Sequence, residues 1–470
     1  MERFSRACTG LMLALFLLLM DASLLLETLG NPGHRSYNAA LLLALLAAAL
    51  FMRLTRRNSS LFARWGARTT GIVLGCACFG LHLLWGLCVS VPIFGDASAY
   101  WETATALAAG APLENASYLA LFPHLLGYAS FLSLFLRVFG AYKLVAVLLN
   151  VCLCTASGLL LYRLCLRYGT LRQAGWALLL WTLCPSKLMY SGMVLSDGMY
   201  TCLMLAIVAL LARLEQRGMN PGRLILSALL AGALLWTMNA ARPLGAVMLI
   251  ALLLWMLFLR GTGKGLGRWL AVLALLFAVY VPLGQIWNAH IEQLVGEAPA
   301  PIPGYNIYVG FNQETGGTYS EDDMGLLGDY RWEEGGSAVS AQWKMLQAAK
   351  ERIASGNLDF PRLFADKMRN FSGSDQGAAF SMGPAFNTRQ YQVAAVLSNV
   401  FYYAVVLLAN LGAWRLWRRG EHGVALCLPL FGLGLFLAQM LVEVSLRYHY
   451  ALLPILIALA VMSVPEAQRR

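Results

Sequence analysis

Long apolar segments separated by short polar loops run through most of the chain. Thirteen of them approach the roughly 20 residues that a helix needs to cross a bilayer. They cover 7–29, 37–54, 70–91, 118–139, 141–162, 173–191, 195–213, 224–241, 244–260, 269–290, 391–414, 423–443 and 447–464. One long polar stretch, 291–390, interrupts the series. The pattern predicts an all-α polytopic membrane protein of about 12–13 hydrophobic helices with one large exterior loop.

The overall composition excludes a water-soluble globular protein. Of the 470 residues, 59% are hydrophobic and 13% are charged, and the mean hydropathy is +0.62. Soluble domains carry roughly 25% charged residues. The excess apolar surface is therefore expected to face membrane lipids.

The basic residues lie mainly in the short loops and tails. These hold 21 of the 35 Lys and Arg residues but 4 of the 24 acidic residues, whereas 291–390 holds 8 basic and 13 acidic ones. Short basic loops are typical of the cytoplasmic side. We therefore expect both termini in the cytoplasm, 92–117 and 291–390 outside the cell membrane, and no nucleic-acid partner for the net charge of +11.

This topology allows one net crossing between 117 and 163, where two apolar segments lie. Either 118–139 or 141–162 therefore does not span the membrane. The first is favoured because Pro123 and Gly127 interrupt it, and non-helical backbone at membrane depth needs protein or water around it. In the alternative, the basic loop that follows lies outside, which breaks the charge pattern.

The chain divides into four regions by composition. An apolar run follows Arg3 and Arg6 without a small-residue cleavage site, which predicts a signal anchor. The predicted regions are an extra N-terminal pair of spans (1–69), a catalytic membrane module with the first exterior loop 92–117 (70–290), the exterior loop region (291–390) and the C-terminal spans (391–470).

Two amphipathic helices are expected in the exterior loop region. In 337–356, helical spacing predicts one apolar face formed by Val339, Trp343, Leu346, Ala349 and Ile353. The second segment, 358–371, is expected to lie along the membrane surface. It carries Phe360, Leu363, Phe364, Met368 and Phe371.

The ten cysteines do not indicate a disulfide framework, since none lies in 291–390. Cys76 and Cys78 form one close pair, and Cys152 and Cys154 another. Neither pair has the spacing or the histidine partners of a metal site in the sequence. We expect these residues to face lipid or the core, and no metal-ligating residues are predicted.

The first exterior loop carries a carboxylate at the expected start of a helix. Asp96 follows Gly95, and one interpretation is that its side chain caps the helix N-terminus. Helical spacing then gives an apolar stripe that could rest on lipid, made of Tyr100, Ala104, Leu107, Ala108 and Ala111. The loop 92–117 contains no Lys or Arg.

Three further exterior positions carry ionisable residues next to apolar spans. Lys187 and Asp197 lie in one connection, and Arg242 precedes Pro243 in a second. Glu443 and Arg447 are spaced i, i+4 and would pair if the helix continued, either as a structural salt bridge or as part of a site. Ionisable groups at such positions are functional candidates because burying them is costly.

The order and spacing of these motifs resemble the type-C (GT-C) membrane glycosyltransferases, the relatives of protein O-mannosyltransferase and lipid A aminoarabinose transferase. The resemblance covers about 70–464, and Ala97 stands where many relatives carry a second acid. The motifs are Gly95-Asp96-x3-Tyr100, Phe122-Pro123-His124-Leu125-x-Gly127-Tyr128, Pro185-x4-Tyr190-x6-Asp197, Ala241-Arg242-Pro243, Tyr305-Asn306-x-Tyr308-Val309-Gly310 and Glu443-x3-Arg447-Tyr448-x5-Pro454.

The resemblance implies transfer of a sugar from a polyprenyl-phosphate carrier to an acceptor glycan, lipid or protein outside the membrane. A phosphate leaving group needs cations, and the attacking hydroxyl needs a base. The expected roles are Asp96 as base, Arg447, Arg242, Lys187, Tyr100 and His124 for donor binding, Asp197 as second carboxylate, and Glu443 and Tyr448 as supporting residues. No cofactor is required by these residues, and a role for a divalent metal stays open.

Two other functions fit a polytopic protein of this kind. A polysaccharide polymerase or ligase would place essential Arg and His residues in 291–390, which contains no His. A transporter would carry polar residues near mid-span on several helices. Only Asp21 and His82 occupy such positions, and we expect both to form interhelical hydrogen bonds or face a polar crevice.

Overall fold

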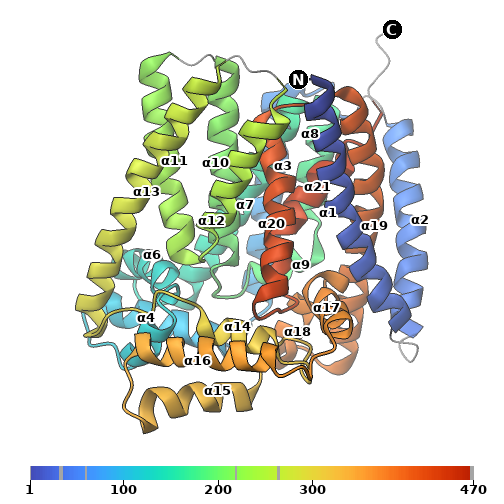
Figure 1. Ribbon diagram of the computed structural model, residues 1–470. Coiled ribbons are helices and arrows are strands. Elements are labelled where there is room, and N and C mark those ends of the chain that lie inside the picture. The colour runs from blue at the N-terminus through green and yellow to red at the C-terminus, as the bar shows by residue number, and fades with distance from the viewer. Residues whose placement is uncertain (1, 31–34, 59–60, 218–219, 262–264, 466–470) are drawn as a thin grey trace.

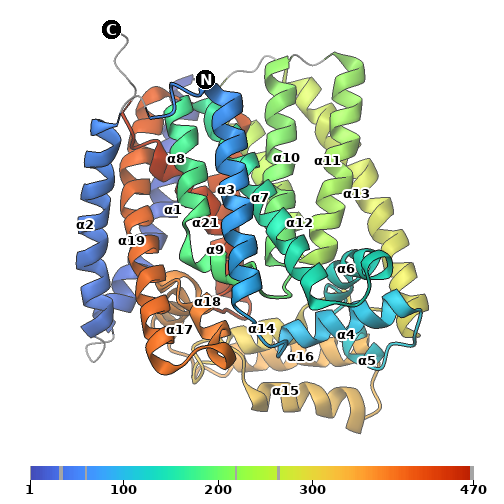
Figure 2. The same cartoon turned by 180° about the vertical axis from the view of Figure 1, so that it is seen from behind.

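The computed structural model describes residues 2–30, 35–58, 61–217, 220–261 and 265–465. Within these ranges the regular structure is helical throughout. Most long helices run between two ends of the molecule (Figures 1 and 2). We call the lower end in Figure 1, where α4 and α14–α18 lie, the loop end, and the upper end, where α1 begins, the terminal end.

Nine helical segments of the described residues are long and apolar enough to cross a membrane. They are α1 (Glu2–Gly30), α2 (Arg35–Arg57), α3 (Gly66–Cys88), α7 (Lys143–Tyr168), α10 (Asp197–Arg217), α11 (Pro221–Ala241), α13 (Leu266–Val295), α19 (Thr388–Arg419) and α20 (Cys427–Leu441) with the 3-10 turn Val424–Leu426 before it. The chain is a multi-pass helical membrane protein, as the hydropathy pattern predicts.

Proline interrupts two of the predicted spans. Segment 173–191 is divided into α8 (Leu171–Thr182) and α9 (Pro185–Tyr190). The residue before a proline is disfavoured in the helical conformation, and Cys184 is accordingly extended, with ψ of 114°. The other short apolar helices are α12 (Gly245–Leu254), which continues as a π-helical turn over Trp255–Leu259, and α21 (Leu452–Val461), which follows the 3-10 turn Tyr448–Ala451.

Of the two competing segments, 118–139 is the one without a helix of spanning length. It is broken around Pro123 into α5 (Ala116–Leu121) and α6 (Leu125–Phe139), whereas α7 covers the competing segment with 26 residues. Helices α4 (Asp96–Ala109) and α6 pack against each other at the loop end. Tyr100 and Ala104 are therefore buried against protein, and for these two residues of the stripe the prediction of contact with lipid is wrong.

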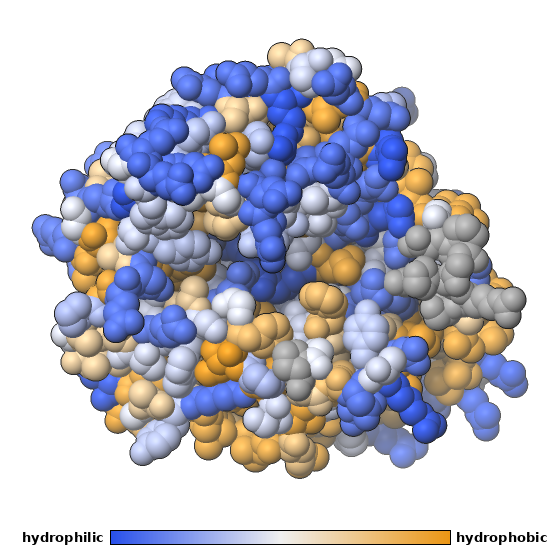
Figure 3. Space-filling view, turned by 90° about the horizontal axis from the view of Figure 1, so that it is seen from below, coloured by the Kyte–Doolittle hydropathy of each residue, from blue (hydrophilic) through white to orange (hydrophobic). Residues whose placement is uncertain are grey.

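The exterior loop region forms a layer of short helices across the loop end (Figure 1). Seen from that end, the surface is mostly hydrophilic, with a recess near its centre (Figure 3). The layer contains α14 (Gly304–Gly310), α15 (Glu321–Gly328) with a π-helical turn over Asp329–Glu333, α16 (Ala338–Ala354), α17 (Phe360–Met368) with a π-helical turn over Arg369–Gly373, α18 (Gly377–Ser381) and the 3-10 turn Gly383–Ala385.

The buried face of α16 differs from the predicted one. Of the five predicted residues only Ala349 is buried, and the Trp343 side chain is 47% exposed. The face that packs against α14 is instead formed by Ala338, Ala341, Gln342, Met345 and Ala349. Close approach of two helices selects small side chains over the largest apolar ones, which periodicity alone does not reveal.

Helix α17 and the turn after it pack on the membrane-spanning helices. Leu363 and Phe371 are buried, and the Phe371 ring lies 5.4 Å from that of Phe436 in α20. This face of 358–371 therefore contacts α1 and α20. Phe360 remains 38% exposed, and contact of this other face with the membrane surface stays a prediction.

The N-terminal helices are integrated into the bundle. Both α1 and α2 pack along α19. Asn410 Nδ2 of α19 donates a hydrogen bond of 3.0 Å to Asp21 Oδ1 of α1, and His82 of α3 lies beside Cys154 of α7. The prediction that Asp21 and His82 make interhelical hydrogen bonds is confirmed.

Candidate active site

The candidate site is built around the first residue of α4. Gly95 precedes the helix with φ of 57° and ψ of −134°, a conformation that favours a residue without Cβ. Asp96 follows as the first helical residue and makes no side-chain capping bond, since the N-cap is Gly95. The interpretation of Asp96 as an ordinary side-chain cap is therefore wrong, and its carboxylate is turned to another partner.

Arg447 joins two carboxylates that are far apart in the sequence. Its Nη2 donates to Asp96 Oδ2 at 2.5 Å, and its Nε lies 3.7 Å from Asp197 Oδ2. The side chains of Arg447 and Asp197 are 16% and 2% exposed, whereas that of Asp96 is 53% exposed. The planar guanidinium thus reaches from the bundle interior to the surface of the loop end.

Arg242 brings a second guanidinium toward the cluster of Arg447, Asp96 and Asp197. It stands directly after α11 in extended conformation, and its guanidinium lies 4.2 Å from the ring centroid of Tyr448 and 5.7 Å from that of Tyr200. The Tyr200 hydroxyl donates to Asp197 Oδ1 at 3.3 Å. Stacking on aromatic rings holds a guanidinium in place while leaving its N–H groups able to bind an anion.

Tyr100 fixes α4 to the segment that carries Asp197. Its buried hydroxyl lies 3.0 Å from Ser196 Oγ, and its ring packs edge-on to that of Tyr128 at 5.2 Å. One turn of helix separates Tyr100 from Asp96, so these contacts orient the start of α4. The Tyr100 hydroxyl is therefore already hydrogen-bonded within the protein and positions α4, whereas the sequence suggested that it binds the donor.

Glu443 does not pair with Arg447, contrary to the i, i+4 prediction. Helix α20 ends at Leu441, and Val442 is extended with ψ of 175°, so the helical register is lost. Glu443 Oε2 instead accepts a hydrogen bond from Asn306 Nδ2 at 3.0 Å, and Oε1 accepts one from the Tyr448 hydroxyl at 3.5 Å. Glu443 therefore connects the exterior layer to the loop that carries Arg447.

The surrounding charges set the protonation of these groups. Desolvation by the protein around the partly exposed Asp96 acts to raise its pKa, but the charge and hydrogen bond of Arg447 outweigh this effect, and the pKa is lowered. Burial and the repulsion from Asp96 raise the pKa of Glu443 to about 6. Burial and the charge of Arg242 lower the pKa of His124 to about 4. At neutral pH Asp96 is therefore an anion and His124 is uncharged.

Lys187 lies deeper than the other predicted donor-binding residues. It is fully buried, and its Nζ donates to the Tyr450 carbonyl oxygen at 3.0 Å and lies 3.0 Å from the centre of the Tyr450 ring. The ammonium is thus bound within the protein, away from the exposed side of Asp96. Lys187 interacts electrostatically with Asp197, as Arg242 and Arg447 do, but its hydrogen bond goes to the backbone of Tyr450.

Two polar residues of the exterior layer were not singled out by sequence reasoning. Asn306 contacts Glu443, and Lys367 Nζ donates to the carbonyl oxygens of Gly310 and Val442 at 2.7 and 2.8 Å. Asn306 belongs to the Tyr305–Gly310 motif, which is a usable signal. Lys367 has no such signal, because a lysine among apolar residues on an amphipathic helix is common at surfaces.

The cysteines provide another correction. Cys78 and Cys154 meet His82 inside the bundle, and the donor atoms of the three residues all lie within 4.8 Å of one another. Cys76 and Cys152 are exposed and Cys78 and Cys154 are buried, as expected for residues that face lipid or the core, but the expectation of no histidine partner is wrong for Cys78 and Cys154. The sequence does place His82 four residues after Cys78, but the approach of α7 to α3 is what adds Cys154.

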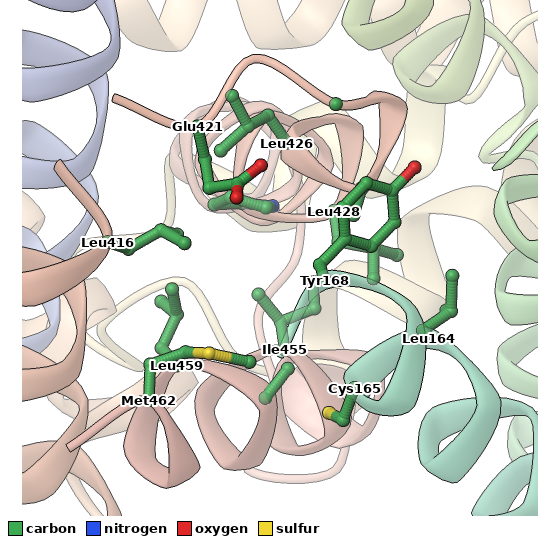
Figure 4. Close-up of a pocket in the computed structure, with 14 residues that line it drawn as sticks. Leu164, Cys165, Tyr168, Leu416, Glu421, Leu426, Leu428, Ile455, Leu459 and Met462 are labelled. Atoms are coloured by element: carbon green, nitrogen blue, oxygen red, sulfur yellow. The ribbon is translucent and has the colours of Figure 1, made fainter. Parts of the chain in front are cut away.

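A separate pocket lies at the terminal end and takes no part in this site. It is lined mainly by apolar side chains of α7, α19, the 421–429 segment and α21. Tyr168 and Glu421 contribute the polar groups, as Figure 4 shows. None of the predicted site residues lines it.

The fold matches one class of membrane protein. Long apolar helices, a helix in the loop that follows α3 and a layer of short helices over one end form the GT-C-like architecture that the motifs predict. The fold class expected from the sequence is confirmed by a solved structure.

That structure is the oligosaccharyltransferase of Archaeoglobus fulgidus tethered to an acceptor peptide with the NVT sequon, which matches with a TM-score of 0.50 and 13% identity over 86% of this chain and 50% of that chain. The archaeal oligosaccharyltransferase AglB of the same organism, in complex with an inhibitory peptide and a dolichol-phosphate, matches with a TM-score of 0.48 and 13% identity over the same shares. The chain therefore spans about half the length of these relatives. No family model and no curated protein matches the sequence.

Proposed function

We propose that the protein is a membrane glycosyltransferase that moves a sugar from a polyprenyl-phosphate carrier to an acceptor outside the membrane. The observation that carries the proposal is the bridge of Arg447 between Asp96 and Asp197. It places one anion and a guanidinium at the exposed side of a membrane-spanning bundle. This is the minimal set for a reaction in which a hydroxyl attacks and a phosphate leaves.

The reaction needs one proton acceptor and one anion-binding group. A bond forms between the acceptor oxygen and the sugar C1 while the bond from C1 to the phosphate oxygen breaks, and the electron pair leaves with the phosphate. Asp96 accepts the proton of the attacking hydroxyl. Because the pKa of Asp96 is lowered, the carboxylate is ionised at neutral pH and can accept a proton once it is released from Arg447.

Arg447 couples donor binding to the release of this base. Its Nη2 donates a hydrogen bond to Asp96 Oδ2 in the structure. The donor phosphodiester offers the same guanidinium a bidentate anionic partner, and its negative charge increases as the sugar leaves. Donor binding would thus exchange one anion for another on Arg447 and free Asp96 for the acceptor, while Asp197 continues to hold the Nε side.

Arg242 is the proposed second phosphate ligand. Its guanidinium rests on Tyr448, next in the chain to Arg447, so the two cations converge on the side where Asp96 is exposed. Two guanidinium groups stabilise the charge that develops on the leaving phosphate better than one. The long apolar tail of the carrier would remain in the bilayer beside the helices.

The decisive experiment is turnover of lipid-linked sugars by purified protein. Polyprenyl-phosphate sugars of different head groups are incubated with the protein and candidate acceptors, and released polyprenyl phosphate is measured. Asp96→Asn should insert normally and lose roughly 10²–10⁴-fold in turnover. Glu102→Gln, on the exposed side of the same helix, is the matched control and should keep activity.

Two outcomes would count against the proposal. Turnover of Asp96→Asn near that of the wild type would remove Asp96 as the base and leave Asp197 as the next candidate. Absence of turnover with every polyprenyl-phosphate sugar, by protein that is folded and monodisperse, would argue against this donor class altogether.

A further inference from the structure

We propose that Cys78, His82 and Cys154 bind one zinc ion inside the membrane-spanning bundle, as a three-ligand Cys2His site separate from the candidate active site. Cys78 and His82 lie four residues apart on α3 and so share one face. Cys154 approaches them from α7. Thiolate sulfur and imidazole nitrogen are the donors that structural zinc sites use.

The distances between the donor atoms suit one small ion. All three donor atoms lie within 4.8 Å of one another, and Cys154 Sγ lies 3.6 Å from His82 Nδ1. In a tetrahedral site with Zn–S of about 2.3 Å and Zn–N of about 2.0–2.1 Å, a sulfur and a nitrogen ligand are roughly 3.6 Å apart. Side-chain adjustment is enough to gather the three ligands.

The surroundings support a metal site rather than three isolated side chains. The side chains of Cys78 and His82 are fully buried and that of Cys154 is 2% exposed. Trp181 Nε1 donates to the Cys154 carbonyl oxygen at 2.9 Å. This contact fixes the backbone position of Cys154 relative to α8.

Charge balance selects zinc among the metals that favour sulfur. Two thiolates and a neutral imidazole exactly compensate a divalent cation, so the occupied site carries no net charge in the apolar bundle. A monovalent copper ion on the same ligands would leave one negative charge, which is costly to bury. The zinc site would join α3 to α7.

The same helices supply a matched control. Cys76 and Cys152 each lie two residues before a proposed ligand, and both are exposed on the outside of the bundle. Replacing them by serine changes the same residue type on the same helices without touching the cluster. Because the proposed site is enclosed, the ion would enter during folding, and the metal has to be supplied during expression.

The test measures the metal content of purified full-length protein expressed in zinc-supplemented medium. We expect about one zinc per chain for the wild type and for Cys76→Ser/Cys152→Ser, and at least a roughly tenfold loss in Cys78→Ser/Cys154→Ser. Wild-type protein with less than about a tenth of a zinc per chain would overturn the proposal, as would equal zinc in the two double variants.

A second measurement decides the matter if the site variant does not fold. Wild-type protein expressed with cobalt in place of zinc should show thiolate-to-cobalt charge-transfer absorption, and His82→Gln should shift or abolish it. Its absence in cobalt-grown wild type would overturn the proposal. So would mass-spectrometric detection of a Cys78–Cys154 disulfide as the main form. Neither measurement depends on glycosyl transfer. Failure of the zinc proposal can therefore be distinguished from failure of the proposed function.

Discussion

At the scale of single residues, Arg447 holds the site together through the shape of its guanidinium. Its Nη2 and Nε face two different carboxylates, Asp96 and Asp197. Both contacts use one rigid planar group, whereas a lysine offers one compact charge on a flexible stem. The side chain therefore sets the distance between a carboxylate in α4 and one at the start of α10.

Arg447→Lys is expected to lower kcat/KM for a polyprenyl-phosphate sugar. The lysine ammonium keeps the positive charge but cannot bridge Asp96 and Asp197 while it binds a phosphate. Arg447→Ala should lower kcat/KM further, by roughly 10²–10³-fold relative to the wild type. Turnover of purified variants measures both. Arg362→Lys is the control, because Arg362 is 69% exposed and its pair with Asp366 is solvated. Full activity of Arg447→Ala would remove Arg447 from the mechanism.

Glu443 predicts a dependence of stability on pH. Burial and Asp96 raise its pKa from 4.5 to about 6, so the native state binds a proton that the unfolded state releases. Protonated Glu443 therefore stabilises the native state relative to the ionised form. This contribution to the free energy of unfolding is present in full below pH 4.5 and is lost as pH rises to about 6. The shift corresponds to about 2 kcal/mol at most, reduced by solvent screening.

Glu443→Gln removes this titration and keeps an amide oxygen for Asn306. Melting temperatures of wild type and variant in detergent should therefore diverge between pH 4.5 and pH 6 or just above, with the variant becoming relatively more stable as pH rises. Glu102→Gln should follow the wild type, since Glu102 is exposed. Parallel curves for wild type and Glu443→Gln would contradict the expectation.

At the scale of elements, backbone contacts join α14 to the segment after α20. Glu443 N donates to the Asn306 carbonyl oxygen at 2.7 Å, and Val444 N donates to that of Gly317 at 2.9 Å. Lys367 binds two carbonyl oxygens at the same junction. The exterior layer therefore positions the loop that carries Arg447, although no residue of the layer contacts Arg447 in an ion pair among those described.

Gly310→Ala should disturb this junction. A Cβ at Gly310 would lie 2.6 Å from the carbonyl carbon of Val442, which is backbone and cannot turn away. We expect a loss of about 1–3 kcal/mol in stability and a fall in turnover, measured by thermal melting and by the lipid-linked sugar assay. Gly325→Ala in α15, where a Cβ meets nothing within 4 Å, should be neutral. Equal melting temperatures and equal turnover of the two variants would show that the junction does not position the loop that carries Arg447.

At the scale of the whole molecule, the site combines segments that are distant in the chain. Asp96, Asp197, Arg242 and Arg447 each stand at the loop end of a different apolar segment. A membrane protein can bring such positions together easily, because every helix that crosses has an end on the same surface. The same arrangement predicts which parts of the chain share one side of the membrane.

Cysteine labelling from outside intact cells tests this topology. In a background without the exposed cysteines Cys76, Cys88 and Cys152, Ala111→Cys and Gln347→Cys should react with a membrane-impermeant reagent. Asn58→Cys, at the terminal end, should react only after permeabilisation. The physical reason is the excess of basic residues in the loops of the terminal end. Labelling of one exterior position without the other would contradict a shared exterior surface.

The sequence by itself determined the helices, the membrane class and most residues of the site. Apolar runs of about 20 residues are decisive because a bilayer leaves the backbone no other way to satisfy its hydrogen bonds. Pro123 and Pro185 mark the positions where two apolar segments are divided into shorter helices, because a proline disfavours the helical conformation of the residue before it. Asp96, Asp197, Arg242 and Arg447 could be recognised because an ionisable group beside an apolar span is costly.

Only the tertiary structure decided which of these residues meet. Arg447 pairs with Asp96 rather than with Glu443, because α20 ends at Leu441 and the periodicity that predicted the local pair ends with it. The face of α16 and the encounter of Cys154 with His82 likewise depend on how closely two helices approach. Spacing along a chain determines neighbours within one helix, whereas contacts between helices depend on packing that no single segment encodes.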